Sequence, residues 1–411
     1  MSKQTIIIGA GAAGMMAAIT ASKANQKVLL LEKLPKIGAK LKATGGGRCN
    51  LTNTLSNEEF MAKFGREGRF MTPALSALDH KELQSFFVTI GVKTHAPDGF
   101  RVFPVGHSSS TIIKALEQEM QKLGVEVLTT QKVIRLEHNR EKIIAVTTET
   151  DTFTAENIII ATGGMGYPML GAEGDGYPLA KLVGHKVTPL HPAMMPLKTK
   201  EKWGANCRAD TIPKVEMRVN IKKYKKLHAQ GDLIFTKNGI RGPVVLDFSR
   251  EITPLLDKFD EVPILINLTK GMNEEQIREH FKAEVQKNNK QTTQTLVETL
   301  LPTPLSLELC HLANANPILS LGKLSGITRD NLIKLLAWTP LTINGHDGFK
   351  MAMITRGGIS LKEINPNTMQ SKKIKGLYFC GEVMNLDGPC GGYNLQWSFA
   401  SGYLAGKLLK S

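Results

Sequence analysis

The sequence is poor in cysteine, and none of its cysteines forms a closely spaced pair. Five cysteines, at positions 49, 207, 310, 380 and 390, make an odd number without a C-x-x-C or C-x4-C motif. This pattern argues against a disulfide framework, a structural zinc site and a dithiol reductase. We therefore predict no metal site and a reducing compartment, which is the cytoplasm by default, with a Cys49–Cys390 pair as the open alternative.

Long hydrophobic runs are also missing. No segment approaches the roughly 20 apolar residues that a membrane-spanning helix needs, and glycines interrupt the apolar run near the N-terminus. We therefore predict neither a membrane partner nor a signal peptide. The 411 residues contain no internal repeat and no low-complexity tract, so their length predicts two or three globular domains.

Acidic residues are scarce in two stretches of a chain whose formal net charge is +15. No acid lies between Glu32 and Glu58, and the many basic residues from Lys198 to Lys226 are offset only by Glu201, Asp210 and Glu216. A positive surface of this kind favours a polyanionic partner. The alternative is a solvated basic face that binds nothing.

The first thirty-two residues have the pattern of a dinucleotide-binding βαβ unit. An apolar strand, 5–8, leads into the glycine-rich turn GAGAAG at 9–14 and an alanine-rich helix, and a second strand, 27–31, ends at Glu32. Gly9 permits the tight turn, Gly11 lets the backbone approach a pyrophosphate, and Gly14 lets the helix pack closely on the strand. The Glu32 carboxylate can accept both hydroxyls of an adenosine ribose.

Other glycine-rich segments follow at intervals along the chain. They are TGGGRCN at 44–50, ATGG at 161–164, GAEGDGY at 171–177, CGE at 380–382 and GGYNLQ at 391–396. Glycines leave backbone N–H groups free to face a ligand, and the segment at 391–396 precedes a helix whose amino end can stabilise negative charge. No second βαβ unit is present, so a nicotinamide electron donor would visit the site transiently.

Periodicity and turn residues predict the remaining elements. In the first half we expect helices at 73–90, 108–123 and 178–184 and strands at 125–128, 132–137, 143–149, 152–154 and 157–160. From about Pro189 we expect strands at 215–221, 233–236, 244–249 and 262–268, helices at 273–287, 292–301, 305–313 and 328–337, and strands again at 341–354. His185 follows the helix stop Gly184, so we interpret it as a capping residue, with catalysis as the alternative.

These motifs together resemble one known family over essentially the whole chain. With GAGAAG, Glu32, TGGGRCN, RVFP, ATGG, GIRGP and LYFCGEV…GGYNLQ in this order, the sequence is similar to the BaiN/RdsA-like (YhiN-like) family of FAD-dependent flavoproteins. The resemblance implies an α/β fold with a Rossmann-like, glutathione-reductase-type FAD-binding domain, interrupted by a β-barrel and a helical subdomain. We predict an FAD domain at 1–190 and 345–411, a barrel at 191–270 and about 318–344, and a helical subdomain at 271–317 that could extend to 338.

The chain departs from the family pattern in two places. The family's barrel motif often reads F-T-H-x-G-x-S-G-P, whereas residues 235–243 read FTKNGIRGP. Lys237 and Arg241 therefore replace a neutral acid–base group with positive charge. The second departure is Cys390, where many members have no cysteine.

Matching motifs carry the family's FAD contacts onto this chain. Glu32 and the residues of 161–163 would hold the adenosine half, 381–382 the ribityl-phosphate half, and 392–395 the flavin ring. The predicted cofactor-binding residues are Gly9, Gly11, Ala12, Ala13, Gly14, Glu32, Lys33, Lys40, Gly46, Gly47, Arg48, Cys49, Asn50, Val133, Ala161, Thr162, Gly163, Gly381, Glu382, Gly392, Tyr393, Asn394 and Leu395.

The family has been linked to aminoacetone oxidation, bile-acid-related reduction and reduction of a uridine in ribosomal RNA, which leaves three hypotheses for this chain. The first is reduction of a C=C bond of a uracil base in ribosomal RNA, with NAD(P)H as the electron donor. The second is an oxidase or reductase of a small molecule, and the third is a flavin-holding RNA-binding factor without turnover. For the first, the predicted RNA contacts are Lys222, Lys223, Lys225, Lys226, Lys237 and Arg241.

Reduction of a C=C bond requires a proton donor beside the flavin ring. A thiol with an ordinary pKa of about 8.5 is mostly protonated at pH 7 and can act as a general acid. We predict this role for Cys390, with Cys49 and Tyr393 as the alternatives. Arg48 and the neighbouring glycine-loop N–H groups are expected to favour the thiolate of Cys49, which would make it a poorer acid.

Overall fold

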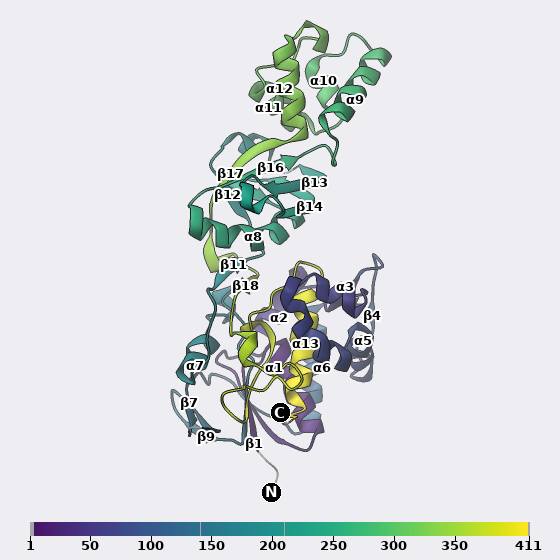
Figure 1. Cartoon of the computed structure of the whole chain (residues 1–411). Coiled ribbons are helices and arrows are strands. Elements are labelled where there is room, and N and C mark those ends of the chain that lie inside the picture. The colour runs from purple at the N-terminus through teal and green to yellow at the C-terminus, as the bar shows by residue number, and fades with distance from the viewer. Residues whose placement is uncertain (1–3, 140, 209, 410–411) are drawn as a thin grey trace. The chain divides into compact units, whose positions relative to one another are not determined.

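The computed structural model describes residues 4–139, 141–208 and 210–409, and these fall into two compact units (Figure 1). Unit 1 contains the described residues up to Pro192 and from Ala352 onward, and unit 2 contains those from Ala193 to Met351. The two ends of the chain, purple and yellow in Figure 1, thus belong to one unit, and unit 2 is an insertion in it.

Unit 1 is built on a five-stranded sheet in the order β19 (Leu377–Phe379), β10 (Asn157–Ile160), β1 (Gln4–Ile8), β2 (Lys27–Leu31) and β6 (Glu126–Leu128). Every neighbouring pair is parallel. The strands are runs of Ile, Leu and Val because helices cover a parallel sheet and bury it on both faces. The ends of β1, β10 and β2 lie in register, with Ile8 opposite Ile160 and Leu31. This confirms the Rossmann-like α/β fold.

Helix α1 (Ala12–Lys23) is buried along most of its length and packs against α13 (Tyr393–Gly406). Small residues allow this close approach, since a Cβ atom added at Gly402 would lie 2.3 Å from the carbonyl oxygen of Ala13. The last helix of the chain is therefore held beside the glycine-rich turn that opens the first.

The rest of unit 1 surrounds this core. Around it lie α6 (Ser109–Lys122), α7 (Gly176–Leu182), a sheet of β3 (Thr52–Asn53), β5 (Arg101–Pro104) and β4 (Thr94–His95), and a meander of β7 (Val133–His138), β8 (Ile143–Thr148) and β9 (Thr152–Thr154). The single helix predicted at 73–90 is wrong. It is divided into α4 (Thr72–Ala77) and α5 (His80–Thr89) because Asp79 caps α5, accepting hydrogen bonds from the backbone N–H groups of Lys81 and Glu82.

Unit 2 contains a closed barrel with the strand order β12 (Leu197–Thr199), β15 (Gly239–Arg241), β14 (His228–Phe235), β13 (Thr211–Val219), β16 (Val262–Asn267) and β17 (Thr339–His346). The strand predicted at 244–249 is wrong, because these residues lie in helix α8 (Pro243–Phe259). Pro243 occupies the first turn, where proline is favoured. The buried residues Val244, Phe248, Ile252 and Leu255 then recur at helical spacing.

Four helices lie between β16 and β17: α9 (Glu274–Lys287), α10 (Thr293–Val297), α11 (Thr303–Leu312) and α12 (Gly326–Ala337). Their apolar residues share one hydrophobic core with the barrel. The predicted barrel segment starting at 318 is therefore too long. The alternative limit of 338 for the helical subdomain agrees with α12, which packs with α9 and α11, whereas only β17 joins the barrel. The return to unit 1 also comes at Ala352 instead of 345, because β17 continues to His346.

Candidate functional site

The turn between β1 and α1 has the geometry of a phosphate cradle. Gly9 has a φ of +101°, and a Cβ atom there would lie 2.7 Å from the carbonyl oxygen of Ala161. A Cβ atom at Gly14 would lie only 1.9 Å from the carbonyl oxygen of Gly9, whereas one at Gly11 would meet nothing within 4 Å. No side chain caps α1, so the first-turn N–H groups, including those of Ala12 and Ala13, can receive an anion.

Glu32 stands at the end of β2, and the backbone fixes its carboxylate. One carboxylate oxygen accepts the N–H of Ala10 at 2.8 Å, and the other accepts the N–H of Leu34 at 2.9 Å. Each oxygen keeps a lone pair for a ribose hydroxyl. The backbone N–H of Gln131 also donates to the carbonyl oxygen of Glu32 at 2.9 Å, which brings the segment leading to the buried Val133 against this corner.

Two lysines of the predicted site make ion pairs. The ammonium group of Lys33 pairs with the carboxylates of Asp175 and Glu173 and so ties the end of β2 to the GAEGDGY loop. Lys40 Nζ lies 2.8 Å from Glu382 Oε2, and Glu382 Oε1 accepts the N–H of Thr355 at 2.9 Å. No sequence motif links Lys33 with Asp175 or Glu382 with Thr355, because the partners are distant along the chain.

The segments that directly follow β10 and β19 lie beside the glycine-rich turn. A Cβ atom at Gly381, whose φ is +77°, would lie 2.8 Å from Cβ of Ala13, and the N–H of Gly381 donates to Ser401. Ala161 hydrogen-bonds Ile8 at 2.9 Å, and Gly163 has a φ of +70°. The hydroxyl of Thr162 is buried against Gly176, where an added Cβ atom would lie 2.2 Å from it, and has no hydrogen-bond partner among the described residues.

The TGGGRCN loop presents backbone that no side chain covers at its glycines. Gly45, Gly46 and Gly47 all have positive φ, and Cβ atoms at Gly46 and Gly47 would meet nothing within 4 Å. Arg48 is exposed, and its guanidinium lies 5.6 Å from the ring of Phe103. This loop needs glycine for its shape, and its open side can face a ligand.

Asn50 connects that loop to the start of α13. Its amide donates to the carbonyl oxygen of Thr52 at 2.9 Å and accepts the N–H of Gly392 at 3.0 Å. Asn394 then fixes the preceding turn, accepting the N–H of Gly388 at 2.8 Å and donating to its carbonyl oxygen at 2.9 Å. The following residue, Leu395, packs against the core. Asn50 and Asn394 thus position the two loops at the amino end of α13.

The three candidate proton donors differ in their surroundings. Cys49 is fully buried, and burial raises its pKa to about 12 even though a hydrogen bond with Thr44 acts in the opposite direction. Our expectation of a thiolate at Cys49 is therefore wrong. The ring of Tyr393 is buried against Phe60, with centroids 4.9 Å apart. Cys390 is only half-buried, and all five cysteines are free, so Cys49 and Cys390 form no disulfide.

The predicted RNA contacts all lie in unit 2. Lys222, Lys223, Lys225 and Lys226 are exposed on the connection between β13 and β14. Lys237 and Arg241 are exposed at the two ends of β15. Lys237 also lines a cavity of about 250 Å³, which is bordered by Pro196, Leu197, Lys198, Thr236, Asn238 and Asp347.

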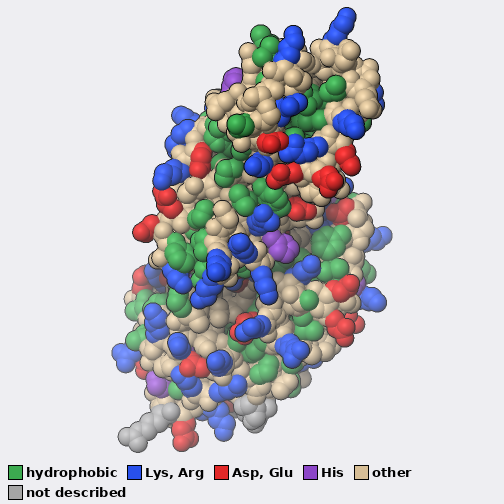
Figure 2. Space-filling view, turned by 45° about the horizontal axis from the view of Figure 1, so that its top comes forward, with side chains coloured by type: hydrophobic (Ala, Val, Ile, Leu, Met, Phe, Trp, Pro, Cys, Tyr) green, Lys and Arg blue, Asp and Glu red, His purple; other side chains and the backbone are tan. Residues whose placement is uncertain are grey.

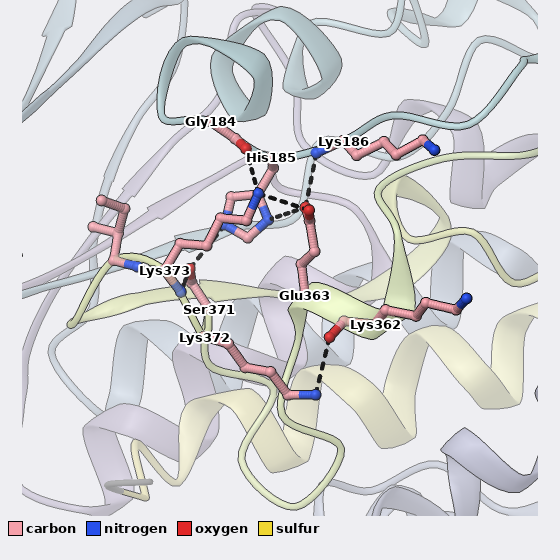
Figure 3. Close-up of polar contacts among 9 residues, drawn as sticks. Gly184, His185, Lys186, Lys362, Glu363, Ser371, Lys372 and Lys373 are labelled. Atoms are coloured by element: carbon pink, nitrogen blue, oxygen red, sulfur yellow. Dashed lines mark hydrogen bonds and ion pairs between the residues drawn. The ribbon is translucent and has the colours of Figure 1, made fainter.

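A buried polar cluster that the sequence did not predict surrounds His185 (Figure 3). His185 Nε2 lies 2.8 Å from Ser371 Oγ, and His185 Nδ1 lies 3.2 Å from Glu363 Oε2. The capping interpretation of His185 is wrong, since Lys373 Nζ donates to the carbonyl oxygen of Gly184 instead. Although the residue types match those of a hydrolytic triad, Ser371 is buried and its hydroxyl accepts two backbone N–H groups. The cluster therefore connects the end of α7 to the segment before β19.

This cluster should make stability sensitive to mild acid. Burial lowers the pKa of His185 to about 4 from 6.5, against an opposite influence of Glu363. Between these values the unfolded chain binds more protons than the folded chain, so stability is full above pH 6.5 and falls as the pH decreases towards 4. Between pH 7.5 and pH 5 the loss should be up to about 2 kcal/mol.

Urea unfolding of wild type and His185→Gln at both pH values measures this loss. The variant should be less stable at pH 7.5 but should lose up to about 2 kcal/mol less on acidification, while His138→Gln, at an exposed histidine, should behave like wild type. Equal losses in His185→Gln and wild type would contradict the prediction.

Comparisons with known proteins identify the family to which the chain belongs. The HI0933-like protein Rossmann domain model matches residues 3–408. A 3-dehydro-bile acid delta(4,6)-reductase of Clostridium scindens is 31% identical over 98% of this chain and 97% of its own. A ribosomal RNA dihydrouridine synthase of Haemophilus influenzae is 30% identical over 97% and 96% of the two chains.

Solved structures share the fold at low identity. The 3-ketosteroid delta1-dehydrogenase of Sterolibacterium denitrificans matches with a TM-score of 0.54 and 10% identity, over 99% of each chain. Among the residues that the structure describes, no helix has the length and apolar character needed to span a bilayer.

The family and the glycine cradle agree on an FAD-dependent oxidoreductase. They also confirm the resemblance to the BaiN/RdsA-like flavoproteins. The chain belongs to the HI0933-like Rossmann domain family.

Proposed function

We propose that this oxidoreductase reduces a C=C bond of a uracil base in ribosomal RNA, forming dihydrouridine. The observation that carries the proposal is the group of four exposed lysines at 222, 223, 225 and 226, none of which forms an ion pair within the described chain. Unpaired lysines on one short connection are suited to neutralising consecutive phosphates. Figure 2 shows further lysine and arginine side chains spread over the visible face, in keeping with the net charge of +15.

We propose one orientation of FAD along these residues. The turn at Gly11 and the amino end of α1 would hold the pyrophosphate, Glu32 the adenosine ribose, and Glu382 with Lys40 the ribityl side. When bound, FAD supplies the hydride for the reduction. Because the part of the chain that the structure describes contains no second βαβ unit, NAD(P)H would use the same face of the site before the substrate does.

The proton would come from Cys390. Of the three candidates it is the least enclosed, whereas Cys49 and Tyr393 are buried. The Cys390 thiol would transfer its proton to the carbon next to the one that receives hydride, so the base gains two hydrogen atoms in total. A uracil inside a helix cannot reach such a site, so the base must be unpaired or extruded.

Reduction of a small molecule is the second candidate, and the 31% identity to a bile acid reductase favours it. In that case the lysines of unit 2 would be a solvated face with no role in catalysis. The names of the relatives therefore do not decide between the two substrates, and a direct test on RNA is needed.

Mass-spectrometric mapping of ribosomal RNA from cells with and without the gene provides this test. We expect one pyrimidine to gain two hydrogen atoms only when the gene is present, and a plasmid copy to restore the change. Ribosomal RNA that is identical in both cells would reject the proposal. Turnover of an enone by the same purified protein would then favour the small-molecule candidate.

The FAD site itself can be tested through Glu32. Glu32→Gln keeps the side chain's size but removes the charge that strengthens its hydrogen bonds, so FAD affinity should fall about tenfold. Fluorescence titration of apoprotein with FAD measures the change, and Glu58→Gln, at an exposed acid of helix α3 (Asn57–Ala62), should bind like wild type. Unchanged affinity in Glu32→Gln would mean that the carboxylate only holds the backbone of Ala10 and Leu34.

A further inference from the structure

The connection between β13 and β14 carries an aromatic and basic cluster next to the four lysines. Residues Lys222–Tyr224 form a 3-10 turn, closed by hydrogen bonds from Tyr224 N–H to the carbonyl oxygen of Ile221 and from Leu227 N–H to that of Tyr224. The turn places Tyr224 between two pairs of exposed lysines. Its ring packs edge-on against Phe259, the last residue of α8, with the two centroids 5.9 Å apart.

Lys258 lies against both rings. Its ammonium is 5.7 Å from the centroid of Tyr224 and 5.1 Å from that of Phe259, and it donates a hydrogen bond to the Tyr224 hydroxyl at 3.1 Å. Phe259 nevertheless keeps 38% of its surface exposed, although large aromatic side chains usually bury more. An exposed phenylalanine beside the ammonium group of Lys258 is poorly explained by core packing alone.

We propose that Tyr224, Phe259 and Lys258 form a stacking platform for unpaired bases of RNA, a proposal that rests on the proposed function of the chain. We call these three residues the platform. Single-strand binding sites combine cations that follow the phosphates with aromatic rings on which bases stack. Here the platform provides the aromatic rings. The cations beside it are Lys222, Lys223, Lys225 and Lys226.

The chemistry selects a single strand over the alternatives. A duplex stacks its bases internally and offers only phosphates and groove edges to a protein surface, so it would engage the lysines but not the rings. An anionic membrane would likewise attract the lysines, but it presents no bases on which the two aromatic rings could stack. The platform would therefore hold unpaired nucleotides of the RNA substrate.

The test uses the full-length holoprotein and three probes of equal length: oligouridylate, the same backbone without bases, and a duplex RNA. Tyr224→Leu and Phe259→Leu keep apolar bulk but remove the aromatic faces. Each should weaken oligouridylate binding about 5- to 150-fold, the usual range for one lost base stack, and leave the base-free and duplex probes unchanged. Tyr224→Phe, which keeps the ring, should bind oligouridylate within about twofold of wild type.

Other results would overturn the platform. Equal losses on all three probes would show that the variants disturb the lysines or the fold, and circular dichroism with the flavin spectrum separates these cases. No loss on oligouridylate would mean that Tyr224 and Phe259 are only packed together. Loss of binding to phosphatidylserine vesicles, with oligouridylate unaffected, would assign the surface to a membrane.

The platform and the proposed function can fail separately. If the wild type selects oligouridylate through Tyr224 but ribosomal RNA shows no gene-dependent dihydrouridine, the platform stands and the reaction is wrong. If dihydrouridine forms equally well with wild type and Tyr224→Leu, and binding is also unchanged, the reaction stands and the platform is wrong.

Discussion

Cys390→Ala should slow transfer of hydrogen to the substrate about 10²- to 10⁴-fold, the usual range for a lost general acid. Cys390 is half-buried on the turn that Asn394 fixes through Gly388, directly before the amino end of α13. Cys390 is not one of the residues that form the pyrophosphate cradle, so FAD content should not change. Reduction of the flavin by NAD(P)H should also keep its normal rate.

Stopped-flow absorbance separates the two halves of this reaction. Flavin bleaching with NAD(P)H reports the first half, and its recovery with ribosomal RNA from cells lacking the gene reports the second. Cys390→Ser should recover little, because a hydroxyl is a far weaker acid than a thiol. Cys49→Ala is the matched control, since burial already raises the pKa of that thiol to about 12. If both Cys390 variants act like wild type, the proton comes from Tyr393 or another group.

The sequence predicts those parts of the fold whose signal lies within one short segment, either as a periodic pattern of apolar residues or as a residue type that a position requires. The strands β1 and β2, the glycine turn and Glu32 lie within one short segment, and each has a residue type that its position requires. Gly9 and Gly14 illustrate this, because a Cβ atom at either position would collide with backbone carbonyl oxygens. The insertion of a barrel was predicted by the change of composition and the alternating segments from about Pro189, and the whole-chain resemblance agreed with it.

Helix α8 shows how a local pattern can mislead. Val244 and Val245 are β-branched neighbours and favour a strand, yet both are buried in the first turn of a helix. Gly242 and Pro243 were the better signal, because glycine before proline at a first helical position marks a helix start. The spacing of Phe248, Ile252 and Leu255 supports the same interpretation over a longer window.

The chemistry of the site depended on burial and on distant partners, which a sequence does not display. Arg48 beside Cys49 suggested a lowered thiol pKa, but the side chain of Cys49 is buried while Arg48 turns to Phe103. His185 and Ser371 are separated by 186 residues and meet at 2.8 Å. Neither residue lies in a recognisable motif, so only the fold could bring them together.

Reversing the charge of the four lysines together, as Lys→Glu at 222, 223, 225 and 226, should remove most of the salt dependence of RNA binding. These side chains are exposed, and each phosphate that a lysine neutralises adds about −0.7 to −0.9 to the slope of log K against log salt. Loss of four contacts would flatten the slope by about 3. Between 50 and 200 mM salt the wild type should then lose about 10²-fold more affinity than the variant.

Net charge alone would lower affinity in any such variant, so the control must change it equally. Lys→Glu at 282, 290, 323 and 334 makes the same change in charge, at four exposed lysines of the helical part of unit 2. This control should keep a steep slope, because its lysines are not on the β13–β14 connection. Filter binding of ribosomal RNA fragments across a salt series measures both variants, and their flavin spectra should match wild type. Equal slopes for the two variants would mean that the four lysines at 222, 223, 225 and 226 form a solvated face that binds no RNA.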